Sequence, residues 1–577
     1  LWRAIDNGKI IFPLFVHLSK TSYGKNEEFF LFSTILSATM IDKKIGEKHI
    51  YFELSIGNSG NSIDGHNIPC QVLDDSDAED ALECVRTDLT TCQSTTTSAK
   101  PMTHDKIYYF LPYWDNKPCM HTISVWPDFR KRMYNSNMIS KIADALEEGL
   151  TETHMLMESE NSNAEKKLKT VLENLSMACS RYVNLTKGTL SCPGTGKTKL
   201  DKERMKLCQR EIEKLATSSR NLKALVTKSS FKERYKTAGT YLQKLKFLEE
   251  DPQQSLPDVF IWALSGNKRL AYYRIPARDI IYSVVNEECG RECGKVQSLF
   301  LKLPGKKSVG PSGWTIQVNL QIYMWLGLLK HKKNYIEGIP KGYEISNEIK
   351  NVEKLRAPPP RVLHYRSMHS FQLRAHMYQA RSLIGSDASG LSDPFARVIL
   401  GEYCKTTQVL DETLSPTWDE LLVFDEILLW GIKEDIKKDP PTIIVEIFDQ
   451  DRVGKSEFIG RALAKPYVKL LEDPYEGPKF PPPLEWHEIL RGPDHAGELL
   501  ACFELLEYTK HSNELPQLPL PKETIIENST AIDIDTGPLL PVPRGIRPTL
   551  AKYRQVKKKK NLISFVTFLG CIIKLKK

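Results

Sequence analysis

Two short acidic loops, each directly after a strand-like run, constrain the fold of this 577-residue chain more than any other feature. The first loop, residues 386–394, follows the run 372–377, and the second loop, residues 449–457, follows the run 443–448. Alternating or β-branched apolar runs bounded by Gly, Pro and Asp are typical of antiparallel sheets. Residues 371–508 are therefore predicted to form an antiparallel β-sandwich with both loops at strand ends.

The two loops contain five carboxylates: Asp387, Asp393, Asp449, Asp451 and Glu457. Calcium is a hard cation that takes about six to eight oxygen ligands and tolerates irregular geometry. Carboxylates gathered at one rim would repel one another without a cation. The pattern predicts a Ca²⁺ site if the sandwich brings both loops to the same rim. The alternative is that these residues only form turns, in which Asp side chains bond nearby backbone groups.

Four separated motifs in this stretch resemble a C2 domain in their order and spacing: residues 385–387, 390–395, 414–420 and 448–460. The resemblance implies that the five carboxylates hold Ca²⁺ and that the domain then binds phospholipid. Glu457 departs from the family pattern, which usually has Asp at this position. Because Glu has a longer reach, the resemblance leaves the affinity and the number of ions open.

Bound calcium would make the rim positive and let the loop tips approach a membrane. Val453 lies between Arg452 and Lys455, and this pairing of an apolar group with cations suits contact with anionic lipids. The alternative is that Val453 is an isolated surface aliphatic residue, which is common. Lys405 is the one cation among residues 402–409, so this run does not favour a polybasic inositide site.

Length and composition predict several domains in a cytosolic setting. The chain is too long for one core, and 41% hydrophobic and 26% charged residues are typical of globular proteins. The net charge of +8 suits anionic partners without selecting membrane over nucleic acid. The twelve cysteines show no paired spacing apart from Cys289 and Cys293, which lack the second pair of a zinc site. The chain starts at Leu1 without a visible signal peptide, and we interpret it as a fragment.

Residues 126–247 have a helical period. Apolar residues recur at steps of three and four in two series: Ile139, Ile142, Leu146 and Leu150, then Leu168, Val171, Leu172 and Leu175. Breakers at Gly149, residues 188–196 and Ser218-Ser219 are expected to divide the region into about four helices, which favours a four-helix bundle. Residues 127–250 contain 24 Lys and Arg against 16 Asp and Glu. Beside a lipid-binding domain this excess favours membrane contact, and the alternative is a solvated basic face.

Residues 193–198, Pro-Gly-Thr-Gly-Lys-Thr, look like the end of a phosphate-binding P-loop. That loop needs Gly where this chain has Ser191, a buried strand before it and a helix after it. Residues 183–185 are too short and polar for such a strand. The sequence therefore disfavours an ATPase that acts through Lys197.

The remaining regions are assigned as β segments and linkers. Residues 1–57 contain two β runs, 10–16 and 50–56, whose partners are expected upstream of Leu1. The predicted organisation is: an incomplete sheet domain at 1–57, an acidic and Thr/Ser-rich linker at 58–105, a helical bundle at 106–251, a mainly β module at 252–338, a linker at 339–369, a sandwich domain at 370–510, and a Pro-rich linker with a basic and apolar tail at 511–577. The apolar run 561–573 is too short to span a bilayer as a helix.

This order of modules resembles the ferlins over residues 1–555, on the distinctive matches 134–138, 269–276 and 300–306. The resemblance implies a FerA-like four-helix bundle, a FerB-like module and one complete C2 domain, joined by disordered linkers. No Trp-rich DysF insertion follows the FerB-like module, which places the chain nearer the otoferlin and fer-1-like-six branch than dysferlin or myoferlin.

The ferlin resemblance implies a non-enzymatic protein at the cytoplasmic face of membranes. It would bind anionic phospholipid through calcium, act in membrane trafficking or fusion, have membrane-fusion proteins as partners and bind no nucleic acid. Two alternatives are open: a calcium-independent membrane tether or protein-interaction scaffold, and the ATPase. Full-length ferlins carry a C-terminal membrane helix, which residues 556–577 do not match.

Overall fold

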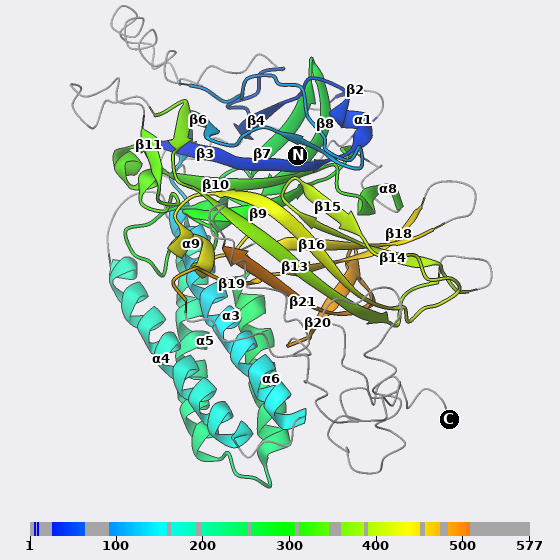
Figure 1. Ribbon diagram of the computed structural model, residues 1–577. Coiled ribbons are helices and arrows are strands. Elements are labelled where there is room, and N and C mark those ends of the chain that lie inside the picture. The colour runs from blue at the N-terminus through cyan, green and yellow to red at the C-terminus, as the bar shows by residue number, and fades with distance from the viewer. Residues whose placement is uncertain are drawn as a thin grey trace, which may run out of the picture.

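The computed structural model describes the following residues: 5–6, 9–10, 26–63, 92–158, 163–191, 198–251, 253, 255–305, 311–345, 359–385, 390–450, 456–473 and 483–507. Figure 1 shows the β-rich part of the chain and, below it, the long helices that extend away from it. None of the helices in these stretches is both long and apolar enough to cross a bilayer.

The first β-rich unit contains two sheets that share one core. The larger sheet has the order β11 (Tyr343–Ile345), β12 (Val362–Tyr365), β6 (Asn116–Pro127), β3 (Asn26–Ile41), β10 (Val318–Leu328) and β9 (Lys295–Leu301), with β5 (Tyr109–Leu111) paired to β3. The smaller sheet consists of β4 (Tyr51–Ile56), β7 (Val259–Ser265) and β8 (Lys268–Ile275). In β3, Phe29 and Leu31 face the shared core, whereas Phe30 and Phe32 face a second, aromatic core. Because β3 is apolar on both faces, it lies in the interior of the unit.

Both long strands of the predicted segment 1–57 pair with residues far downstream. Strand β3 lies between β6 and β10, and β4 pairs with β7. The predicted run 10–16 lies outside the described residues apart from Ile10. Strands β3 and β4 complete the sheets of the predicted module 252–338. The expectation of partners before Leu1 is therefore wrong for the predicted run 50–56, which forms β4. The reason is that pairing over more than two hundred residues leaves no local pattern in the sequence.

Part of the predicted linker 58–105 belongs to the same unit. Ile50 and Ala99 exchange two backbone hydrogen bonds of 2.9 Å, and the backbone N–H of Leu54 donates to the carbonyl of Ser94 at 2.8 Å. Residues 92–100 therefore run along β4. The Thr96 hydroxyl bonds inside the unit, since its Oγ1 accepts from the backbone N–H of Phe52 at 2.9 Å.

The helical region forms α3 (Arg130–Glu158), α4 (Ala164–Ser191), α5 (Lys199–Ala224) and α6 (Phe231–Glu249), which pack around one apolar core. All eight apolar positions predicted from the helical period are buried in this core, which confirms the period. Two predicted breakers are wrong, because Gly149 lies inside α3 and Ser218-Ser219 lie inside α5. A Cβ at Gly149 would lie 2.7 Å from Val171 Cγ2, so this glycine permits close contact between α3 and α4 instead of ending a helix.

Helix α3 is attached to the first β unit by side-chain hydrogen bonds to backbone carbonyls. Asn137 Nδ2 donates to the carbonyls of Arg278 and Glu288 at 2.9 and 3.0 Å, and Tyr134 Oη donates to the carbonyl of Tyr282 at 3.0 Å. Asn137 is buried. One amide group thus satisfies one carbonyl of α7 (Ala277–Ile280) and one carbonyl of the loop after it.

Replacement of Asn137 by Ala is expected to lower the free energy of unfolding by about 2 kcal/mol, because buried carbonyls lose their donor. Urea unfolding followed by circular dichroism measures this loss. The matched control is Asn221→Ala, which removes an exposed asparagine of α5 and is expected to change stability by less than about 0.5 kcal/mol. Equal losses in both variants would show that the two carbonyl contacts do not stabilise the chain.

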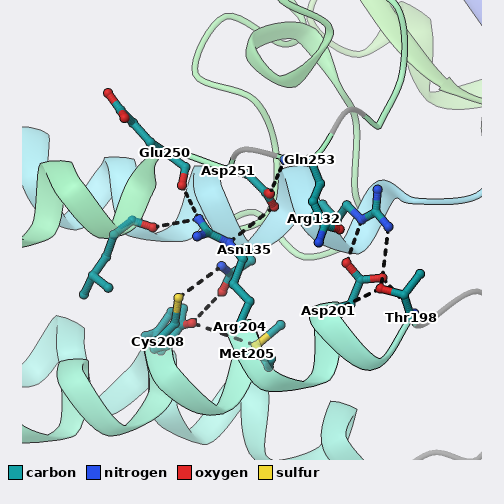
Figure 2. A network of polar contacts seen from close by, with 12 residues as sticks. Arg132, Asn135, Thr198, Asp201, Arg204, Met205, Cys208, Glu250, Asp251 and Gln253 are labelled. Atoms are coloured by element: carbon teal, nitrogen blue, oxygen red, sulfur yellow. Dashed lines mark hydrogen bonds and ion pairs between the residues drawn. The ribbon is translucent and has the colours of Figure 1, made fainter. Parts of the chain in front are cut away.

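A polar network connects the ends of α5 and α6 with α3 (Figure 2). Arg132 Nε donates to Asp201 Oδ1 at 2.7 Å, and Asp201 also forms a capping box with Thr198 at the start of α5. Arg204 donates to the carbonyl of Leu248 at 3.1 Å and pairs with Asp251 at 3.4 Å. The network therefore positions the N-terminal part of α5 beside the C-terminal end of α6.

His121 of β6 is a buried histidine, and neither of its ring nitrogens has a hydrogen-bond partner among the described residues. Burial, supported by the charges of Lys332 and Arg361, lowers its pKa to about 4. Between this value and the usual 6.5 the unfolded chain binds a proton that the folded chain does not. Stability contributed by neutral His121 is therefore lost as the pH falls through this window.

Lowering the pH from 7 to 5 is expected to destabilise the chain by about 2 kcal/mol through His121. The variant His121→Leu should lose this part of the pH dependence, whereas His49→Leu, at an exposed position, should keep it. Urea unfolding of the three proteins at both pH values makes the comparison. An unchanged pH dependence in His121→Leu would contradict the assignment.

The second β-rich unit is a sandwich of nine strands. In spatial order they are β15 (Tyr403–Thr406), β14 (Pro394–Leu400), β17 (Ile443–Asp449), β18 (Glu457–Ala464), β20 (Glu485–Arg491), β21 (Asp494–Glu507), β13 (Met368–Arg381) and β16 (Thr417–Trp430), with β19 (Tyr467–Lys469) paired to β21. A single residue pair, Arg461 with Leu490, links β18 to β20. The two halves of this order therefore face each other over one core.

The outer face of β14, β17 and β18 packs against the first β unit. Phe395, Phe448 and Phe458 form one small cluster with Trp314, and Ile399 and Ile444 form another with Met40 and Ile316. Short elements complete the described structure: β1 (Ile5–Asp6), β2 (Lys9–Ile10), α1 (Lys43–Gly46), α8 (Pro311–Trp314), η2 (Leu329–Ile336) and α9 (Lys433–Lys438). The sandwich is thus docked by one sheet face, which leaves its loop rim at an end of that face.

Candidate functional site

Three neighbouring strands bring the predicted acidic residues to one rim of the sandwich. Strand β14 begins at Pro394, directly after Asp393, and Pro394 pairs with Asp449 at the end of β17. Asp449 in turn pairs with Glu457 at the start of β18. Because paired residues of antiparallel strands lie on the same side of a sheet, Asp449 and Glu457 share one side of this edge.

Asp393 and Asp449 are in direct contact. The backbone N–H of Asp393 donates to Asp449 Oδ1 at 2.6 Å, and the backbone N–H of Gln450 donates to the carbonyl of Asp393 at 3.0 Å. The two loops predicted to meet therefore do meet at these two residues. The side chain of Asp449 also has the same parity as the inward-facing Ile447, which aims it between the two halves of the sandwich.

Asp449 is only 1% exposed, and its Oδ2 atom has no hydrogen-bond partner among the described residues. A buried carboxylate oxygen without a partner is costly, so such atoms call for a ligand or water. A hard cation that prefers carboxylate oxygens fits this atom. The donor chemistry of the rim therefore suits Ca²⁺.

A third segment, not assigned to the site from the sequence, supports Asp393. The backbone N–H of Glu412 donates to Asp393 Oδ1 at 2.7 Å, and the N–H of Thr413 donates to the carbonyl of Ser392 at 2.8 Å. Trp418 is fully buried nearby, and its Nε1 donates to the carbonyl of Pro394 at 3.4 Å. The motif 414–420 thus has a physical role, since it orients the end of the first loop. No local pattern marks Glu412, because it contributes only its backbone.

The neck of the first loop is closed by two glycines. A Cβ on Gly385 would lie 2.3 Å from the carbonyl oxygen of Gly390, and Gly390 itself has a φ of +78°. Only residues without a side chain fit both conditions. The two ends of the loop that contains Asp387 therefore lie against each other.

Several predicted site residues lie outside the described stretches: Asp387, Asp451, Arg452, Val453 and Lys455. Of the remaining ligand candidates, Asp393 is half-buried, Asp449 is buried and Glu457 is exposed. Within the stretches that the structure describes, no three Asp, Glu, His or Cys side chains are grouped closely enough to hold a metal ion. The described geometry thus joins Asp393 and Asp449, and the contribution of the other three ligands stays a prediction.

The face that would carry an inositide site has other contacts. Lys405 Nζ donates to the carbonyl of Val423, and the Arg397 guanidinium lies 4.4 Å from the ring centroid of Phe448 and 5.5 Å from that of Tyr108. Tyr108 belongs to the first β unit. Both cations therefore make contacts within the protein.

The structural context of the P-loop-like motif differs from that of a nucleotide site. Helix α4, not a strand, precedes residues 192–197, and Thr198 is the N-cap of α5. The backbone N–H of Asp201 donates to Thr198 Oγ1 at 3.1 Å, and Asp201 Oδ2 accepts from the backbone N–H of Thr198 at 2.9 Å. A carboxylate therefore already stands at the helix start where a phosphate would bind. Lys197 lies outside the described residues.

Comparison with known proteins identifies the modules. The family model of the FerB (NUC096) domain matches residues 252–327, and that of the C2 domain matches residues 371–472. Fer-1-like protein 4 of Mus musculus is 34% identical over 554 residues, which cover 93% of this chain and 26% of that protein. The chain belongs to the ferlin family. The FerB and C2 predictions are thereby confirmed, and strands β20 and β21 extend the C2 sandwich beyond the matched residues.

A second relative agrees with this ferlin assignment. Myoferlin of Homo sapiens is 23% identical over 792 residues, which cover 92% of this chain and 36% of that protein. The chain thus spans well under half the length of these two curated relatives. Among solved structures, a C2 domain of plant Extended Synaptotagmin 1 is similar at 18% identity with a TM-score of 0.20, covering 25% of this chain and 100% of that domain. The placement within the ferlins beside otoferlin stays a prediction.

Proposed function

We propose that this ferlin chain binds phospholipid membranes in a calcium-dependent manner through its C2 domain and acts in membrane trafficking or fusion. The observation that carries the proposal is the buried Asp449 carboxylate, which contacts Asp393 across the two loops and has an Oδ2 atom without a partner in the described part of the chain. Ca²⁺ would be held by Asp387, Asp393, Asp449, Asp451 and Glu457. Bound calcium supplies positive charge and open coordination positions for lipid phosphate oxygens.

The residues of the chain have distinct parts in this proposal. Asp449 ends β17, Glu457 begins β18 and Asp393 directly precedes β14, so strand ends hold these three acids at the rim. Asp387 and Asp451 would complete the ligand set from the loops, and Arg452, Val453 and Lys455 would contact the anionic bilayer. The location that follows is the cytoplasmic face of membranes, with membrane-fusion proteins as partners. The activity is binding without catalysis.

The four helices favour a second candidate, a calcium-independent membrane tether. We propose that they form the FerA-like module of the family. Phe247 of α6 is 77% exposed and Leu200 of α5 is 57% exposed, and both have lysine neighbours in sequence, Lys246 and Lys199. Apolar side chains flanked by cations suit an anionic membrane surface. This candidate predicts binding that survives removal of calcium.

Sedimentation with liposomes separates the two candidates. The chain would be mixed with phosphatidylcholine vesicles, with or without phosphatidylserine, in calcium or in chelator. The C2 proposal predicts that wild-type protein pellets only with calcium and phosphatidylserine, and that Asp449→Asn with Asp451→Asn stays in the supernatant. The matched control is Asp439→Asn, an acid 65% exposed before the opposite end of β17, which should pellet like wild type. Equal pelleting of all proteins in chelator would favour the tether.

A further inference from the structure

An open groove of about 590 Å³ lies between α4 and the C-terminal part of α5, on the outside of the four helices. Three of its lining residues are cations, Arg181, Arg220 and Lys223, and one is an acid, Glu173. Two serines of α4, Ser176 and Ser180, also line it. The groove therefore combines an excess of positive charge with hydroxyl groups.

Within the described part of the chain, Arg220 is held in this groove by hydroxyls and not by a carboxylate. Its Nε donates to Ser176 Oγ at 2.8 Å, and its Nη2 donates to Ser180 Oγ at 2.9 Å. The hydroxyl protons are used elsewhere, because Ser176 Oγ donates to the carbonyl of Ala216 at 3.1 Å and Ser180 Oγ donates to the carbonyl of Ser176 at 2.8 Å. Both serines are thus oriented as acceptors for the guanidinium. These hydrogen bonds position the Arg220 guanidinium, and because the serines are neutral they do not compensate its positive charge.

The other two cations differ from Arg220 in having acidic partners. Lys223 pairs with Glu173 at 2.9 Å, and Arg181 pairs with Glu287 from the loop that follows α7. The Arg181 side chain is 69% exposed and that of Glu173 is 52% exposed, and exposed ion pairs of this kind are weak. An anion that enters the groove would therefore compete with these pairs at little cost. Nη1 of Arg220 has no hydrogen bond to any described residue, so it is available for an incoming oxyanion.

We propose that this groove binds a phosphate group, with Arg220 as the central donor and Lys223 and Arg181 at its sides. A guanidinium presents several N–H donors in one plane, and this geometry matches the oxygens of a phosphate. The two serines pre-orient the guanidinium, so little side-chain entropy is lost on binding. The phosphate could belong to a lipid head group or to a soluble phosphorylated molecule. The site is separate from the calcium rim and does not depend on the proposed C2 function.

The test uses the whole chain in chelator, so that the acidic loop rim of the C2 domain binds no calcium. Calorimetric titration with glycerol 3-phosphate probes a soluble phosphomonoester, and sedimentation with phosphatidylcholine vesicles, with or without phosphatidic acid, probes the lipid form. Wild-type protein is expected to bind at least one of the two phosphate probes. Arg220→Ala should weaken that binding at least tenfold. Ser176→Ala with Ser180→Ala should weaken it about threefold to tenfold, although the charge of Arg220 is retained.

Arg210→Ala is the matched control, because Arg210 lies on the same helix, is 65% exposed and contacts only Glu211 among the interactions of described residues. It should bind like wild type. Arg220-dependent titration with glycerol 3-phosphate would identify a soluble ligand, and Arg220-dependent sedimentation with phosphatidic acid alone would identify a lipid head group. Absence of binding to both probes, or equal weakening by Arg220→Ala and Arg210→Ala, would overturn the proposal. Circular dichroism of each variant verifies that the helices are folded.

Discussion

Calcium is expected to raise the thermal stability of the C2 domain, and Asp449→Asn is expected to abolish this effect. A ligand that binds only the folded state stabilises it by about 2.7 kcal/mol when its concentration is a hundred times its dissociation constant. Asp449 should be required for this gain, because calcium would satisfy its buried Oδ2 atom. Differential scanning calorimetry with calcium and with chelator measures the effect.

Without calcium, the stabilities of wild type and Asp449→Asn depend on the buried charge of Asp449. Asn at this position keeps an oxygen that can accept from the N–H of Asp393 but removes the buried charge. The variant should therefore be at least as stable as wild type without calcium and less stable with it. The control Asp439→Asn should retain the full calcium response. A calcium-induced shift of the same size in Asp449→Asn would show that this carboxylate is not a ligand.

Arg461→Met is expected to lower the free energy of unfolding by about 3 to 5 kcal/mol, because it leaves a buried carboxylate without its cation. Arg461 Nη2 lies 2.7 Å from Glu446 Oε1, and the Glu446 side chain is 3% exposed. Both residues lie on the face of the sandwich that packs against the first β unit. Tyr108 of that unit also donates to Glu446 Oε2, and burial raises the pKa of Tyr108, so it stays a donor. Urea unfolding gives the loss.

A double variant distinguishes loss of charge pairing from loss of packing. Glu446→Gln with Arg461→Met removes both charges, and replacement of a buried ion pair by neutral groups is often nearly neutral. The double variant should therefore recover most of the stability that Arg461→Met loses. If it is as unstable as the single variant, the ion pair is not the reason for the loss. The loss would then come from the contacts of the Arg461 guanidinium with two aromatic rings, whose centroids lie 5.1 Å away in Phe458 and 5.7 Å away in Phe300.

The sheet face of the C2 sandwich that packs against the first β unit also supports the strand ends that carry the acids. The aromatic cluster of Phe395, Phe448 and Phe458 lies one residue from Pro394, Asp449 and Glu457 along the same three strands. The strand ends that carry the acids are thus supported from behind by Trp314 of the first unit. Arg461→Met is for this reason also expected to weaken the calcium response.

Local patterns in the sequence were sufficient for the helices and for the acidic loops. The period of three and four residues predicted the buried faces of α3 and α4, because a helix places such residues on one side. The same reasoning failed for Gly149 and Ser218-Ser219, since a long packed helix tolerates residues that would end an isolated one. It also assigned residues 92–100 to a linker, although their backbone pairs with β4.

The sequence by itself determined the C2 sandwich, the contact between its two acidic loops and the membership in the ferlins. Short motifs predict these properties, because their spacing along the chain reflects strand and turn geometry. Only the tertiary structure decided which strands lie beside β3 and β4, and that the outer face of the C2 sheet docks on the first unit. It also decided that, among the residues it describes, Arg220 has two serines and no acid as hydrogen-bond partners. Such pairings depend on surfaces from segments far apart in the chain, and no local period records them.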